Sequence, residues 1–80
     1  MGVKKYLERI RYIDYLISHK STGNCDQLSR KLGLSRSSTL EYLRLMKDLG
    51  FPISYSRNRN SYYYSEEGKM IKSFFVKEEI

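Results

Sequence analysis

Polar and basic side chains recur at helical spacing in the middle of the chain. The members that we expect near the start and on the outward face of one helix are Arg36, Ser37, Ser38, Leu40, Glu41 and Arg44. Arginine can donate two hydrogen bonds to guanine, glutamate can accept one from cytosine, and leucine can pack on a thymine methyl group. An ordinary surface ion pair between Glu41 and Arg44 is the alternative for those two residues. The pattern indicates contacts with the base edges of DNA.

A second polar group consists of Arg57, Asn58, Arg59 and Asn60, which lie between two segments of alternating residues. Such a group at the tip of a hairpin can contact the phosphate backbone or enter the minor groove. Ser21 and Thr22 precede another predicted helix, where hydroxyls and free N–H groups can donate to a phosphate. We therefore predict that both groups contact the DNA backbone.

The residue types in the sequence give little support for a catalytic site or a metal site. His19 and Cys25 are the only histidine and the only cysteine, so one chain supplies neither a Cys/His catalytic pair with a third partner nor a usual zinc site. Glycine-rich phosphate-binding loops are absent. The sequence predicts no enzyme, no metal, no cofactor and no small-molecule ligand.

Three helices are predicted to position the first group. Apolar residues at spacings of four, three and four indicate a helix over residues 3–20. Asn24, with Gln27 three residues later, forms a capping-box pattern that begins a second helix, and Gly33 suits its end. After a turn over residues 33–35, Ser35 caps a third helix that reaches about residue 49, and Pro52 prevents its continuation.

From residue 53 to residue 65 the period changes to two, which predicts a β-hairpin. Pairing Ser56 with Ser61 places Tyr55 opposite Tyr62 and Ile53 opposite Tyr64, and so brings all the inward residues to one side. We expect Tyr55, Tyr62 and Tyr64 in the core. Tyr63, on the outer face, could instead stack on a single-stranded base, which keeps an RNA-binding alternative open.

The tail over residues 66–80 has apolar residues on both of its alternating faces. A strand or a short helix could produce that pattern, and we favour a strand. We expect residues 1–65 to form one domain and the tail to form a strand or a dimer contact. The residues proposed for that contact are Ile71, Phe74, Phe75 and Ile80, with Tyr12 or Tyr15 as further candidates.

The segment Leu32-Gly33-Leu34-Ser35-Arg36, followed by Ser38-Thr39, Leu43, Met46 and Leu49-Gly50-Phe51-Pro52-Ile53, resembles the winged helix-turn-helix of DeoR-type regulators. The resemblance covers roughly residues 7–65 and implies an α+β fold of three helices and a β-hairpin wing, to which the tail could add a further C-terminal strand. Glu41 replaces a residue that is basic in many relatives, the wing tip lacks their glycines, and no effector domain follows. The resemblance implies a DNA-binding protein rather than a metabolite sensor.

Charge and composition agree with a polyanionic partner. Residues 1–64 contain twelve lysines and arginines and five acidic residues, a net charge of +7. The chain has no apolar run that could cross a bilayer, so we expect a cytoplasmic protein without a membrane partner. We predict a homodimeric, sequence-specific double-stranded DNA-binding protein that regulates transcription in a prokaryote or its mobile elements. A winged-helix module that binds another protein is the alternative from a different class.

Overall fold

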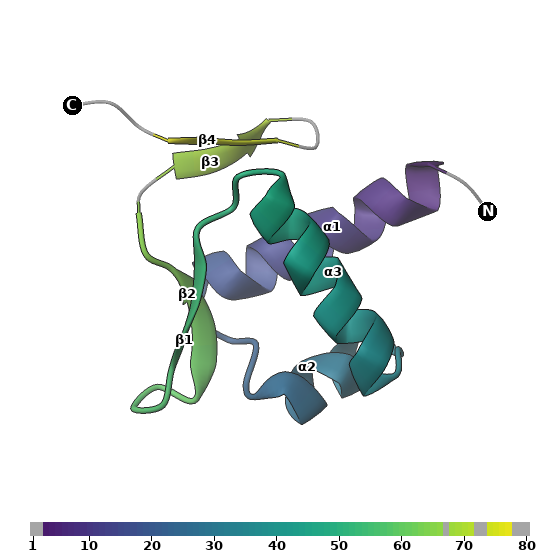
Figure 1. Cartoon of the computed structure of the whole chain (residues 1–80). Helices are drawn as coiled ribbons and strands as arrows, with labels where there is room; N and C mark the ends of the chain where they lie inside the picture. Colours follow the sequence, from purple (N-terminus) through teal and green to yellow (C-terminus); the bar gives the residue numbers. More distant parts are fainter. Residues whose placement is uncertain (1–2, 67, 72–73, 78–80) are drawn as a thin grey trace.

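The computed structural model describes residues 3–66, 68–71 and 74–77, with side chains for residues 4–66 (Figure 1). The helices are α1 (Val3–Ser18), α2 (Cys25–Leu32) and α3 (Arg36–Asp48). The strands are β1 (Ile53–Ser56), β2 (Ser61–Tyr64), β3 (Gly68–Ile71) and β4 (Phe74–Lys77). The predicted α+β layout, three helices followed by an antiparallel hairpin, is therefore confirmed.

The helix ends follow from local side-chain chemistry. The Asn24 side chain accepts from the Gln27 N–H at 2.8 Å, and the Gln27 side chain accepts from the Asn24 N–H at 2.8 Å, which confirms the capping box. Gly33 ends α2 with a φ of 69°, and the Ser35 hydroxyl accepts from the Ser38 N–H at the start of α3. Helix α1 ends two residues earlier than predicted, because Lys20 has a φ of 54° and cannot continue a right-handed helix.

The three helices and β1 enclose one small apolar core. Its buried residues are Ile10, Ile13, Leu16, Ile17, Leu28, Leu43, Met46, Phe51 and Ile53. Helices α2 and α3 are also joined by a buried polar contact, in which Ser29 Oγ lies 2.8 Å from Thr39 Oγ1. Burial of both hydroxyls is tolerated because Thr39 also donates to the Ser35 carbonyl at 2.9 Å. The core therefore fixes the angle at which α3 leaves the turn after α2.

The hairpin of β1 and β2, here called the wing, has the predicted register. Ile53 pairs with Tyr64, Tyr55 with Tyr62 and Ser56 with Ser61. The placement of Tyr55 in the core was wrong, because its side chain is 40% exposed. Figure 1 shows why: the wing extends beyond the helices toward its tip, so the outer half of β1 has no core beneath it. The Tyr55 ring contacts the Tyr62 ring instead, with centroids 4.9 Å apart.

The tail differs in detail from the single strand that we favoured. Its described residues form two short antiparallel strands, with Gly68 opposite Lys77 and Ile71 opposite Phe74. They make a separate two-stranded sheet and do not join the wing sheet (Figure 1). The side chains of Ile71, Phe74 and Phe75, and the whole of Ile80, lie outside the described residues, so the expected dimer contact in the tail stays a prediction. Within the described part of the chain, no helix has the length and apolar character needed to span a bilayer.

Candidate nucleic-acid interface

One face of α3 is open to solvent and contains most of the predicted base-contacting residues. The exposed members are Arg36, Ser37, Leu40, Glu41 and Arg44. Leu40 is 42% exposed although it is apolar, whereas Thr39 is buried. The face therefore presents a mixture of hydrogen-bonding groups and one aliphatic side chain, which is the mixture that base edges in a major groove can contact.

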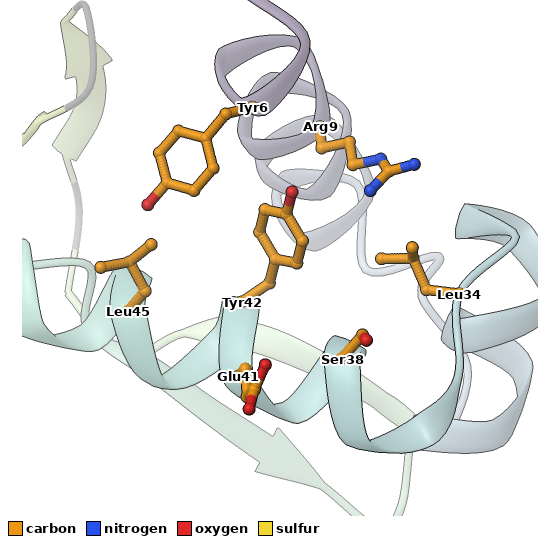
Figure 2. A pocket seen from close by; sticks show the side chains of 7 residues that line it. All are labelled: Tyr6, Arg9, Leu34, Ser38, Glu41, Tyr42 and Leu45. Carbon is orange, nitrogen blue, oxygen red and sulfur yellow. The ribbon is translucent and has the colours of Figure 1, made fainter. Parts of the chain in front are cut away.

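Ser38 does not belong to this exposed face. Its hydroxyl accepts from Ser35 at 3.1 Å, and its half-buried side chain lines a cavity of about 290 Å³ between α1 and α3. Figure 2 shows the Tyr6 ring from α1 and the Tyr42 ring from α3 side by side at this cavity, with centroids 5.6 Å apart, and the Arg9 side chain nearby. Ser38 therefore begins the helix rather than extending from it, and its predicted contact with a base is disfavoured.

Arg36 forms an ion pair that the sequence analysis did not anticipate. Its guanidinium donates to the Asp26 carboxylate at 2.6 Å, and both side chains are mostly exposed. The same hydrogen bond is the main cause of a raised pKa of Arg36. The alternative pair between Glu41 and Arg44 is not formed among the described residues. Asp26 therefore holds the arginine that we expected to contact guanine, and spacing alone could not reveal this because Asp26 belongs to another helix.

A groove of about 320 Å³ separates α3 from the wing. It is lined by Leu40, Leu43, Arg44, Lys47 and Tyr62. Burial, followed by the neighbouring Cys25 thiol, raises the pKa of Tyr62 to about 12. Tyr62 therefore stays a neutral phenol near neutral pH, and it adds no negative charge to a groove that carries two cations.

The wing tip is fixed to the start of α2 through Gln27. Asn60 Nδ2 donates to Gln27 Oε1 at 3.0 Å, and the Tyr55 hydroxyl donates to Asn60 Oδ1 at 2.6 Å. Asn60 has a φ of 53°, and Arg57, Asn58 and Arg59 are exposed beside it. The arginines of the tip are therefore carried by a turn whose position relative to the helix-turn-helix is set by side-chain hydrogen bonds.

The predicted phosphate contact at Thr22 was wrong. Thr22 is fully buried, and its hydroxyl lies 3.1 Å from Ser61 Oγ, donates to the Gly23 carbonyl at 2.8 Å and accepts from the Tyr62 N–H at 2.9 Å. The Thr22 N–H also donates to Ser61 Oγ at 3.2 Å. Every polar group through which Thr22 could donate to a phosphate is used within the protein.

Thr22 instead closes the free edge of β2. The Tyr62 N–H points away from β1 and is bonded by Thr22, so the turn between α1 and α2 replaces a third strand. This explains why Ser61, although it alternates along β2 with Tyr62, is only 1% exposed. Ser21, next to Thr22, is exposed as its predicted role requires.

The comparisons with known proteins give no independent guide to this surface. No protein-family model, no curated protein and no solved structure matches the chain. Among the described residues, no group of three or more histidine, cysteine or acidic side chains could hold a metal ion.

Proposed function

We propose that this protein binds double-stranded DNA in a sequence-specific manner and regulates transcription. Helix α3 would enter the major groove through Arg36, Ser37, Leu40, Glu41 and Arg44, and the wing would contact the backbone or the minor groove. The observation that carries the proposal is the hydrogen bond between Asn60 and Gln27, since it joins the turn that carries the wing arginines to the start of α2 in the helix-turn-helix. Two contact regions held in this way can engage a duplex without a large ordering cost.

The charge distribution supports a nucleic-acid partner. Residues 1–64 carry a net charge of +7, and the exposed cations of α3 and of the wing tip add attraction for phosphates. Glu41 lies among the predicted base-contacting residues as an exposed acidic side chain of α3. An acid at that position would lower affinity for any backbone and favour sites that offer it a cytosine amino group.

We expect the functional form to be a homodimer. One 80-residue chain contacts few base pairs, and two copies would double both the sequence that is recognised and the phosphates that are contacted. Tyr12 and Tyr15 support this expectation, since they are 44% and 56% exposed on α1. Sedimentation equilibrium of the wild type and of a Tyr12→Ser/Tyr15→Ser variant would test whether these residues contribute to a dimer.

The central experiment selects bound fragments from a random duplex pool and then measures affinity for the selected site over a range of salt concentrations. For wild type, log affinity should fall linearly with log salt concentration, by about 0.9 per phosphate neutralised. An Arg57→Ala/Arg59→Ala variant should make that slope shallower by up to about 1.8. The matched control is Lys4→Ala/Lys5→Ala, which removes the same charge at the far end of α1 and should leave the slope almost unchanged.

Base recognition is tested separately from backbone contact. Arg36→Ala should weaken binding to the selected site more than binding to a random duplex, because a base contact discriminates and a phosphate contact does not. Asp26→Asn should strengthen binding to both duplexes several-fold, since it releases the Arg36 guanidinium and removes a negative charge. A protein that selects no sequence, or whose affinity is independent of salt, is not the DNA-binding regulator proposed.

A further inference from the structure

A concave basin between the turn after α1, the outer face of α2 and the wing tip is not used by the proposed contact of α3 with DNA. Its volume is about 540 Å³. Four of its lining residues are cations, namely Lys20, Arg30, Lys31 and Arg59. The amide side chains of Gln27 and Asn60 also face it, and none of the described residues that line it is acidic. This composition provides positive charge and hydrogen-bond donors in one hollow.

Among the described residues, none of these four cations forms an ion pair. Lys31 Nζ donates to the Ser21 carbonyl, so this ammonium group is held at the turn beside Lys20. Like charges kept close together repel one another, and an anion placed between them would relieve that repulsion.

Two residues that line the basin have a left-handed backbone conformation. Lys20 and Asn60 both line it, and they are the two non-glycine residues with positive φ in the described part of the chain, at 54° and 53°. Asparagine tolerates this conformation, whereas lysine is unfavourable there and glycine would be preferred. Lys20 is the left-handed residue that ends α1, where the Ser21 N–H donates to the Leu16 carbonyl at 2.9 Å, so a glycine at this position would keep the turn and remove only the cation.

We propose that this basin binds a phosphate group. Arginine and lysine are the usual partners of phosphate, and the fixed amides of Gln27 and Asn60 can donate to its oxygens. The group can come from two sources, a phosphodiester of a bound duplex or a free phosphate compound. The first source rests on the proposed function and would add a backbone contact outside α3, whereas the second is independent of it.

The first arm of the test uses pyrophosphate as the probe and the full chain labelled with ¹⁵N, at constant ionic strength. Saturable shifts of the Gly23 amide and of the Gln27 and Asn60 side-chain amides support the site. Arg30→Ala/Lys31→Ala should weaken this binding about tenfold or more, since it removes charged donors, and alanine preserves α2. The control is again Lys4→Ala/Lys5→Ala, with the same loss of charge.

The second arm measures the affinity of the same variants for a duplex across a salt series. If the source is a phosphodiester, Arg30→Ala/Lys31→Ala, here called the basin variant, should make the slope of log affinity against log salt concentration shallower by about one to two. The control variant should leave this slope unchanged. Lys20→Gly should reduce binding in whichever arm is positive while leaving thermal stability equal or higher, because glycine fits the positive φ. If the Lys20→Gly protein binds the probe weakly but has normal thermal stability, misfolding is excluded as the cause of the weak binding.

The two proposals fail in different ways. Equal behaviour of the basin variant and the control toward both probes, or shifts that do not saturate, would overturn the phosphate site even if Arg36→Ala still alters sequence preference. Saturable pyrophosphate binding that the basin variant abolishes, in a protein that selects no DNA sequence, would keep the phosphate site and reject the proposed function.

Discussion

Replacing Thr22 by valine tests whether the turn between α1 and α2 stabilises the wing through hydrogen bonds. Valine has nearly the shape of threonine but no hydroxyl, so the partly buried Tyr62 N–H would lose the acceptor that lies 2.9 Å away. The hydroxyl of Ser61 would also lose a partner at 3.1 Å. A buried donor left without a partner costs about 1–3 kcal/mol, and we expect Thr22→Val to lower the free energy of unfolding by about 2–3 kcal/mol.

That loss is large for a chain of this length. Small domains have unfolding free energies near the low end of about 5–15 kcal/mol, and 1 kcal/mol shifts the melting temperature by about 4–8 °C. The expected fall in melting temperature is therefore roughly 10–20 °C. Urea unfolding followed by far-ultraviolet circular dichroism would measure it, and a two-state transition with an unchanged dependence on urea would confirm that only stability has changed.

The matched control is Thr22→Ser, which keeps the hydroxyl and removes the methyl group. Loss of one buried methyl group costs about 1 kcal/mol, so the valine variant should be the less stable of the two. If burial of apolar surface were the whole effect, the order would be reversed, since valine is the more apolar residue. A Thr22→Val protein as stable as wild type, or more stable than Thr22→Ser, would refute the reasoning.

Two further predictions concern stability. Burial, and then the hydrogen bond that the Tyr64 hydroxyl donates to Asp14 at 2.7 Å, raise the pKa of Tyr64 in the folded state. The contribution of Tyr64 to the free energy of unfolding is therefore complete below the ordinary pKa of tyrosine and is lost as pH rises above it. Urea unfolding between about pH 9 and pH 11 should therefore show a decline that is smaller in Tyr64→Phe, and an equal decline in both proteins would contradict this assignment. Gly23→Ala should destabilise the fold more than Gly33→Ala. Both glycines have positive φ, so the backbone strain is similar in the two variants. An added Cβ at Gly23 would lie 2.4 Å from Gln27 Oε1, whereas a Cβ at Gly33 would meet nothing within 4 Å. Thermal unfolding of the two alanine variants would measure the difference, and equal melting temperatures would show that the Gln27 side chain moves aside at no cost.

Local signals were sufficient for much of the fold. The capping box at Asn24, the left-handed Gly33 and the serine cap at Ser35 each involve residues within four positions of one another, so their partners are fixed by spacing. The wing register also followed from the sequence, since a short turn and a period of two leave one pairing that keeps the apolar residues on one side. The exposed face of α3, apart from Ser38, was predicted from helical spacing alone.

Other features depend on which segments meet in space. Period two correctly placed Tyr55 on the same side as Ile53, but it could not show that the core ends before the wing does, and so Tyr55 is exposed. The tail alternates on both faces, and nothing in that pattern marks the reversal between β3 and β4. For Tyr55 the sequence specified the direction of the side chain but not what covers it.

The sequence by itself determined the three helices, their caps, the register of the wing and the concentration of positive charge in residues 1–64, because each depends on near neighbours or on composition. Only the tertiary structure decided that Thr22 is buried against β2, that Asp26 holds Arg36, and that four cations from three separate segments surround one basin. Those contacts join residues ten or more positions apart, and a single sequence carries no local signal for such pairs, because they form only when the packed core brings their elements together.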